Sequence, residues 1–122
     1  MKHILVIEDD PFLVDIYHTK LKEMGFDVDV ATDGLEGLKK LKEKHFDLLV
    51  LDIVLPHIDG WQILKEIEKD KKLKDLKVFI LSNLGQKEEV EKGLEMGVVK
   101  YFIKAHYTPA EVVDEIKKVL KD

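Results

Sequence analysis

The chain has 122 residues and a formal net charge of −5, from 25 acidic and 20 basic residues. This length suits one domain with an ordinary hydrophobic core, and we expect residues 1–122 to form a single domain. The chain contains no cysteine, which excludes disulfides, thiolate metal sites and cysteine nucleophiles. No apolar stretch approaches the roughly 18 residues that a membrane span requires, so we expect no membrane insertion.

The basic residues counted in this charge are all lysines, because the chain contains no arginine. Lysine and glutamate are mixed along the helical stretches, a pattern typical of solvated helix faces rather than of a nucleic-acid surface. We therefore expect no direct contact with nucleic acid. The amino terminus runs into a strand pattern without a signal peptide, and with the lack of cysteine this predicts a cytoplasmic location.

The first part of the chain begins a regular alternation of apolar runs and helical periods. Residues 4–7 form a continuous aliphatic run, as parallel strands buried on both faces do. Asp10 and Pro11 then predict the N-cap and first turn of a helix that ends at Gly25. Residues 27–30 alternate polar and apolar side chains, which predicts a half-exposed edge strand.

The alternation continues to the end of the chain. A short helix is predicted after Asp33, and the last helix begins at Thr108 with a proline in its first turn. Further helices are predicted between the remaining apolar runs, which occupy residues 48–51, 78–81 and 98–103.

Five strand–helix units in this order predict an α/β fold with a doubly wound parallel sheet and five helices. The alternating second strand suits an edge, whereas the apolar first and third strands suit the centre. We therefore predict the flavodoxin-like strand order 2-1-3-4-5. In this order the ligand crevice lies at the carboxyl ends of the first and third strands.

Polar side chains stand where four of the predicted strands end: Glu8 and Asp9, Asp52, Ser82, and Lys104. An aspartate can act as a nucleophile toward phosphorus, and phosphoryl transfer needs a divalent cation and a cationic side chain to neutralise charge. A lone aspartate at a strand end is most often a turn or cap residue. The combination of carboxylates, hydroxyl and ammonium favours the phosphoryl-transfer interpretation.

These residues resemble a known family over the whole chain. Residues 7–11, residues 52–56 with Gly60, the pair at 81–82 and residues 101–104 are similar to the motifs of response-regulator receiver domains. These domains belong to two-component signal transduction, and the chemotaxis regulators are the nearest type. The four motifs in this order, on five strand–helix units, make the resemblance specific.

The resemblance implies a site that binds Mg²⁺ or Mn²⁺. Asp52 would be the phosphoacceptor, and Asp9 would bind the cation directly. Glu8 would act directly or through water, and the main-chain carbonyl of Val54 would supply another ligand. Asp10 matches a less constrained position, and its residue type favours the role of helix N-cap.

The resemblance also implies roles for three further residues. Lys104 would pair with Asp52 at rest and with a phosphoryl oxygen after transfer. Ser82 would donate a hydrogen bond to the phosphoryl group. Tyr101 would change its rotamer and so report phosphorylation, although an aromatic residue on an edge strand is also commonly a packing residue.

The function that the resemblance implies is a phosphorylation-dependent switch. The donor would be a sensor histidine kinase, a histidine phosphotransfer protein or a small acyl phosphate. A downstream protein would bind the face formed by the fourth helix, the fifth strand and the fifth helix. Such a domain assists its own phosphorylation and dephosphorylation but is not an enzyme with a separate substrate, and we expect no output domain in this chain.

Two positions depart from the family pattern. Ala105 follows Lys104 where the family has a proline with a cis bond, and we predict a trans bond and a rearranged loop here. Asn83, which replaces a small residue, would narrow access to Asp52. Val54 and Leu84 lie two residues beyond Asp52 and Ser82, and neither side chain can orient an attacking water, so we expect a long-lived aspartyl-phosphate.

Two alternatives remain open from the sequence. A phosphatase of the haloacid-dehalogenase type also uses an aspartyl-phosphate, but it needs a second carboxylate two residues after the nucleophile, where this chain has Val54. The other alternative is an interaction module on the same fold that works without phosphorylation.

The five histidines show no metal-ligand spacing.

Overall fold

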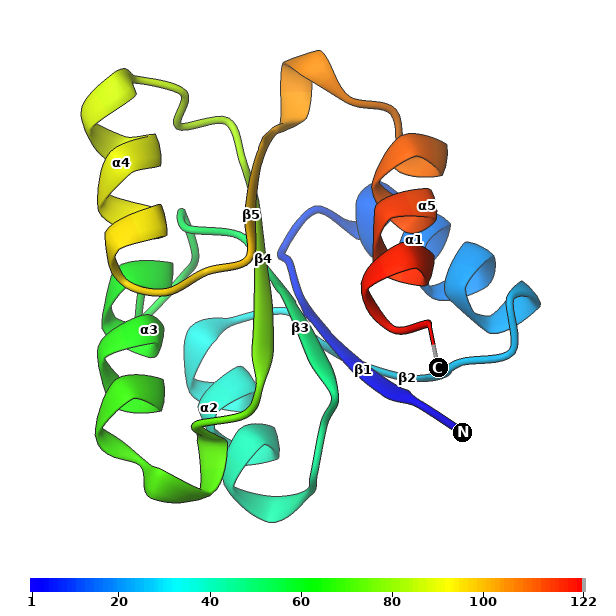
Figure 1. Ribbon diagram of the computed structural model, residues 1–122, viewed down its shortest axis with the longest axis horizontal. Helices are drawn as coiled ribbons and strands as arrows, with labels where there is room; N and C mark the ends of the chain where they lie inside the picture. Colours follow the sequence, from blue (N-terminus) through cyan, green and yellow to red (C-terminus); the bar gives the residue numbers. More distant parts are fainter. Residues whose placement is uncertain (122) are drawn as a thin grey trace.

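A five-stranded parallel sheet forms the centre of the computed structural model, which describes residues 1–121 (Figure 1). The strands are β1 (His3–Ile7), β2 (Asp27–Ala31), β3 (Leu48–Leu51), β4 (Lys77–Ser82) and β5 (Lys100–Ile103). Their order in the sheet is β2-β1-β3-β4-β5, and every neighbouring pair is parallel. The predicted fold class and strand order are both confirmed.

Helices cover both faces of this sheet (Figure 1). One face carries α1 (Pro11–Glu23) and α5 (Pro109–Val119), and the other carries α2 (Gly34–Glu43), α3 (Gly60–Lys69) and α4 (Lys87–Glu95). Two short 3-10 helices, η1 (Lys71–Leu73) and η2 (Lys104–His106), lie in the connections. None of the helices among residues 1–121 has the length and apolar character needed to cross a bilayer.

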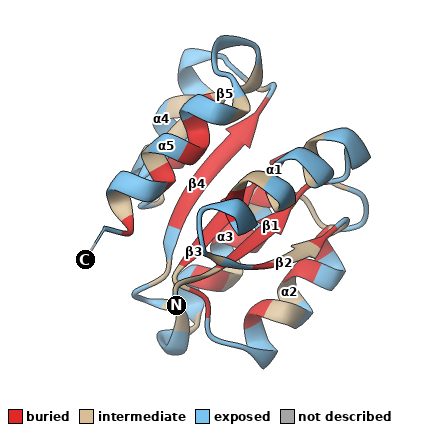
Figure 2. Ribbon diagram, turned by 90° about the vertical axis from the view of Figure 1, so that its right-hand side faces the viewer, coloured by how far each residue is buried: buried red, intermediate tan, exposed pale blue. Residues whose placement is uncertain are grey.

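The sheet separates two hydrophobic clusters, and the central strands contribute to both. Figure 2 shows these central strands coloured as buried over most of their length. Ile4 and Val6 of β1 pack with the α1–α5 layer, whereas Leu5 and Ile7 belong to the cluster on the opposite face. All four side chains are fully buried. This two-sided burial is the physical reason for the continuous aliphatic run, because a half-exposed strand would alternate.

Side chains at the carboxyl edge of the sheet cap the N-termini of the helices. The Asp10 carboxylate accepts a hydrogen bond from the Phe12 amide at 2.9 Å and caps α1, as the sequence predicts. Asp33 and Asp59 cap α2 and α3 in the same way, and Thr108 forms a capping box at α5. Four capped helix starts therefore surround the edge where the strands end.

The fifth strand is shorter than the predicted run over residues 98–103, because it begins at Lys100. Gly97 adopts a φ of +92°, and the Val98 amide donates a hydrogen bond back to the Gly93 carbonyl of α4. Val98 thus belongs to the end of the helix, whereas the Val99 amide already donates a hydrogen bond to the Val78 carbonyl of β4 at 2.8 Å. The apolar side chains here reflect burial of Val98 rather than strand conformation.

The connection after β5 follows the prediction for Ala105. No peptide bond among the described residues is cis, so the Lys104–Ala105 bond is trans. The segment turns through η2 before Thr108 begins α5.

Phe79 tests how strongly the central core stabilises the fold. Its side chain is fully buried in β4, with its ring centroid 5.5 Å from that of Phe102. We expect Phe79→Ala to lower the free energy of unfolding by about 3–5 kcal/mol. Phe12, which is 79% exposed, is the matched control, and Phe12→Ala should change stability by no more than about 0.5 kcal/mol. Urea denaturation measures both, and equal losses would contradict this account of the core.

Candidate functional site

Three carboxylates meet at the carboxyl ends of β1 and β3, which are neighbours in the sheet. Glu8 and Asp9 directly follow β1, and Asp52 directly follows β3, where its amide donates a hydrogen bond to the Ile7 carbonyl at 3.0 Å. The three side chains each place an oxygen within 4.8 Å of the others. Glu8 and Asp52 are buried, whereas Asp9 is exposed, so the cluster opens toward solvent on one side. The three carboxylates therefore meet at the sheet edge where the predicted strand order places them.

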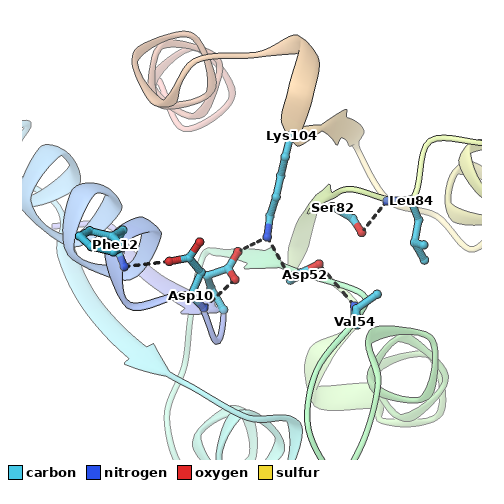
Figure 3. A network of polar contacts seen from close by, with 8 residues as sticks. Asp10, Phe12, Asp52, Val54, Ser82, Leu84 and Lys104 are labelled. Atoms are coloured by element: carbon cyan, nitrogen blue, oxygen red, sulfur yellow. Dashed lines mark hydrogen bonds and ion pairs between the residues drawn. The ribbon is translucent and has the colours of Figure 1, made fainter.

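A single ammonium group lies between two of these carboxylates (Figure 3). The Nζ atom of Lys104 is 2.9 Å from Oδ2 of Asp52 and 2.8 Å from Oε1 of Glu8. Lys104 reaches them from the far side of β4, because β5 does not adjoin β3 in the sheet. Sequence reasoning predicted the pairing with Asp52 but did not predict the second ion pair with Glu8.

The charges in this cluster change the ionisation of its members. Burial raises the pKa of Glu8 above its usual value, and the nearby Asp52 charge adds to this, although Lys104 and the Asp10 amide oppose it. Burial alone would lower the pKa of Lys104, but the carboxylates of Glu8 and Asp52 raise it above the usual lysine value. The buried Oε1 atom of Glu8 makes no well-aligned hydrogen bond among the described residues, so the Lys104 ammonium is its main compensation.

Ser82 and Tyr101 are both connected to the backbone of Leu84, in the loop after β4. The fully buried Ser82 accepts a hydrogen bond from the Leu84 amide at 3.2 Å through its Oγ atom. The Tyr101 hydroxyl donates a hydrogen bond to the Leu84 carbonyl, and burial followed by the charge of Glu89 raises the pKa of Tyr101 to about 12. One residue of this loop therefore links the end of β4 with the aromatic ring on β5.

The loop after β3 contains Val54, whose side chain is 60% exposed at the mouth of the cluster. The Val54 amide lies 3.4 Å from Oδ1 of Asp52 (Figure 3). Farther along, His57 adopts a φ of +69°, in the left-handed region that side chains other than glycine rarely occupy. At the base of the loop, the Gly60 amide donates a hydrogen bond to the Ile53 carbonyl at 2.8 Å.

Gly34 and Gly60 lie against the backbone of this loop. Sequence reasoning included Gly60 in the family motif with residues 52–56 but assigned no role to Gly34. Each glycine follows an N-cap aspartate and occupies the first position of a helix, where alanine is the better helix former. A glycine at such a position indicates that backbone from elsewhere in the fold comes close. The two Asp-Gly pairs in the sequence carry this indication, but they do not show which segment of the chain lies against each glycine.

The cluster has the chemistry of a site for a hard divalent cation. Three carboxylates face one ammonium among the described residues, so negative charge remains in excess. Mg²⁺ binds one or two carboxylates and keeps several waters, which the exposed side at Asp9 allows. The donor set therefore fits a divalent cation, and no histidine belongs to it.

The profile of the response regulator receiver domain family matches residues 4–117. The chain belongs to this family. A curated relative, the alkaline phosphatase synthesis transcriptional regulatory protein PhoP of Bacillus subtilis, is 37% identical in an alignment of 122 positions that covers 98% of this chain and 49% of PhoP. The dual master transcriptional regulator RpaA of Synechocystis is 31% identical over 99% of this chain and 50% of its own. This receiver domain thus spans about half the length of the curated relatives it matches.

Solved receiver domains have the same fold. The non-phosphorylated HemR receiver domain of Leptospira biflexa superposes with a TM-score of 0.91 at 26% identity, over all of this chain and 96% of its own. TrrA of Thermotoga maritima, solved in complex with Mg²⁺ and a beryllium fluoride, gives 0.83 at 32% identity, over 98% of this chain and all of its own.

Membership of the family carries a general function. Receiver domains belong to two-component response regulators, are phosphorylated by histidine kinases and bind Mg²⁺ at an acidic pocket. They are phosphoacceptor switches and are not generally classed as enzymes. In this receiver domain the acidic group consists of Glu8, Asp9 and Asp52.

Glu8→Gln tests the cost of the buried Glu8 charge. Because the pKa of Glu8 is raised in the folded protein, folding is most favourable while Glu8 is protonated, and stability is lost as pH rises through the folded pKa. In the absence of divalent cations, we expect the free energy of unfolding of the variant, relative to that of the wild type, to increase as the pH is raised from about 4 to about 7.

Urea denaturation of both proteins at the two pH values measures this gain. The exposed Glu88→Gln variant on α4 controls for the substitution itself. A stability difference between Glu8→Gln and wild type that does not change with pH would contradict the electrostatic account.

Proposed function

We propose that this chain is a phosphorylation-dependent signalling switch. Asp52 accepts a phosphoryl group from a sensor histidine kinase or a histidine phosphotransfer protein, in a reaction that requires Mg²⁺ or Mn²⁺. The observation that carries the proposal is the position of the Asp52 carboxylate, between the Lys104 ammonium at 2.9 Å and the two other carboxylates of the cluster. This arrangement supplies a nucleophile, a fixed positive charge and a cation site together.

The cation ligands in this proposal are the carboxylates of the cluster and the main-chain carbonyl of Val54. When bound, the cation neutralises charge on the phosphoryl oxygens. Asp9 is exposed and free to approach it, whereas Glu8 is held by Lys104 at 2.8 Å. We therefore assign direct ligation to Asp9 and Asp52, and direct or water-mediated ligation to Glu8.

The transfer itself exchanges one bond to phosphorus for another. An Asp52 carboxylate oxygen forms the new O–P bond, while the N–P bond of the donor breaks and the histidine nitrogen keeps its electron pair. Lys104 then pairs with a phosphoryl oxygen, because that oxygen carries the new negative charge. Ser82 donates its hydroxyl proton in a hydrogen bond to another phosphoryl oxygen.

The hydrogen bonds of Ser82 and Tyr101 to Leu84 support a structural connection from Asp52 to the face formed by α4, β5 and α5. In the structure, Ser82 accepts from the Leu84 amide and Tyr101 donates to the Leu84 carbonyl. When the Ser82 hydroxyl turns to the phosphoryl group, the loop after β4 loses the hydrogen bond from the Leu84 amide to Ser82. A change in the position of Tyr101 then shifts the equilibrium between two packings of the face formed by α4, β5 and α5. A downstream protein that binds one packing better completes the switch.

Exposed apolar side chains at the carboxyl edge of the sheet support a protein as the phosphoryl donor. Four of them follow different strands and are all exposed: Phe12, Leu35, Val54 and Tyr107. Exposed apolar side chains at the edge that carries a polar site are typical of a protein-binding surface.

Asp52→Asn tests the phosphoacceptor. After incubation with Mg²⁺ and acetyl phosphate, we expect intact-mass spectrometry to show one added phosphoryl group on the wild type and none on the variant, because an amide is a poor nucleophile at phosphorus. Asp59→Asn is the matched control: it changes another aspartate of the same loop but keeps a residue suited to the N-cap of α3, and it should be phosphorylated like the wild type.

Failure of acetyl phosphate calls for a phosphohistidine donor, because Asn83 stands beside Ser82 and narrows access. Absence of the adduct with both donors would overturn the proposal. It would favour the phosphorylation-independent interaction module instead.

Val54→Gln tests the lifetime of the phosphorylated state. The exposed Val54 side chain at the mouth of the site has no group that orients a water, and a glutamine amide at this position would supply one. We expect the variant to lose its phosphoryl group roughly tenfold faster. The decay of the phosphorylated mass after removal of donor measures both lifetimes, with Val54→Ile as the apolar control. Wild-type decay within seconds would contradict the expected long lifetime.

A further inference from the structure

We infer that Gly34 is a positioning residue for the cation site: the first turn of α2 supports the loop after β3 and so sets where the Val54 carbonyl lies beside Asp52. This inference rests on the proposed function, because it concerns the cation ligand assigned there. Gly34 itself has no side chain and belongs to another strand–helix unit. Its effect acts through backbone contact with the loop.

The contact between α2 and this loop is too close for any side chain at position 34. A Cβ atom built on Gly34 would lie 2.0 Å from the carbonyl oxygen of Ile58 and 2.9 Å from its carbonyl carbon. Both are backbone atoms, which cannot rotate away as the end of a side chain can. The Gly34 amide also faces the Pro56 carbonyl at 3.4 Å. The two backbones therefore touch along two residues of the loop.

The loop is bent sharply where it meets α2. The Ile58 amide donates a hydrogen bond to the Pro56 carbonyl at 2.9 Å, two residues back, and His57 between them has a φ of +69°. These features define a γ-turn with a positive φ at its centre, a rare and strained conformation. Such strain persists only where surrounding structure holds it. The first turn of α2 is the structure that holds it here.

The base of the loop is also closed by a glycine. A Cβ atom on Gly60 would lie 2.7 Å from the carbonyl oxygen of Asp52 and 2.7 Å from Cα of Ile53. The Gly60 amide bonds the Ile53 carbonyl at 2.8 Å. The segment that carries Val54 is thus held at both ends by backbone contacts, and its freedom to move relative to Asp52 is small.

The start of α2 is rigid enough to act as a support. The Asp33 carboxylate accepts a hydrogen bond from the Glu36 amide at 2.8 Å, and the Glu36 carboxylate accepts one from the Thr32 amide at 2.9 Å. These two hydrogen bonds order the chain on both sides of Gly34. α2 also packs beside α3, which begins where the loop ends.

Gly34→Ala tests the inference directly. The added methyl group must displace the loop, so we expect the affinity for Mg²⁺ to fall roughly 10- to 100-fold, as it does when groups that orient metal ligands are changed. Isothermal titration of the unphosphorylated protein with Mg²⁺ measures the affinity. In the absence of Mg²⁺, the amide NMR signal of Val54 should also shift, although it is far from position 34 in the sequence.

Gly37→Ala is the matched control, because it makes the same change one turn later in α2. Its methyl group would meet side-chain atoms of Ile7 instead of backbone, with Cδ1 at 2.4 Å and Cγ1 at 2.9 Å. We expect this variant to bind Mg²⁺ like the wild type and to keep the Val54 signal in place. Equal losses of affinity in both variants would show a general effect on α2 and overturn the inference.

A second variant keeps the test decisive if Gly34→Ala does not fold. Pro56→Gly frees the backbone next to the γ-turn without adding an atom, and Pro56 is exposed, so the fold is not threatened. We expect it to weaken Mg²⁺ binding severalfold while far-UV circular dichroism stays unchanged. Unchanged affinity in this variant, like unchanged affinity in a folded Gly34→Ala, would overturn the inference.

The wild-type titration separates this inference from the proposed function. If the wild type binds no Mg²⁺, the cation site fails and the inference fails with it. If the wild type binds Mg²⁺ and accepts a phosphoryl group while Gly34→Ala binds Mg²⁺ equally well, only the role of Gly34 is wrong.

Discussion

The contact of one lysine with two buried carboxylates is the interaction on which the site depends. Strand order brings Glu8 and Asp52 to neighbouring strand ends, where burial and the nearby Asp52 charge raise the pKa of Glu8. Lys104 lies within 2.9 Å of both and offsets part of this cost. The offset is incomplete, because the pKa of Glu8 stays raised and Asp9 adds a third carboxylate. The described residues of the site therefore carry an excess of negative charge, which is the physical basis for its attraction to a divalent cation.

Side-chain caps and close backbone contacts order the segments that surround these charges. Capped helix starts surround the carboxyl edge of the sheet, and the loop after β3 is held by close backbone contacts at Gly34 and Gly60. The loop after β4 ties Ser82 to Tyr101 through the two polar backbone groups of Leu84. One loop thus positions a ligand next to the charged cluster, and the other offers a way for a change at the cluster to reach β5.

Much of this arrangement could be predicted from the order of residues, and the exceptions have a common cause. The aliphatic runs identified the strands, Asp10 and Thr108 identified helix starts, and the polar residues at strand ends identified the cluster. The predicted fifth strand was two residues too long, because burial of Val98 at a helix end resembles a strand in sequence. The ion pair between Lys104 and Glu8 was missed, because it depends on the reach of a side chain across β4.

The sequence by itself determined the fold class, the strand order and the set of chemical groups at the carboxyl edge. Periodicity and strand-end position are local properties that hydrophobic burial and chain connectivity translate directly into topology. Only the tertiary structure decided which groups share the Lys104 ammonium, that His57 adopts a positive φ, and that α2 touches the loop after β3 at Gly34. These features arise from distances of a few ångströms between segments far apart in the chain. Packing in three dimensions sets such distances, and no local pattern of residues encodes them.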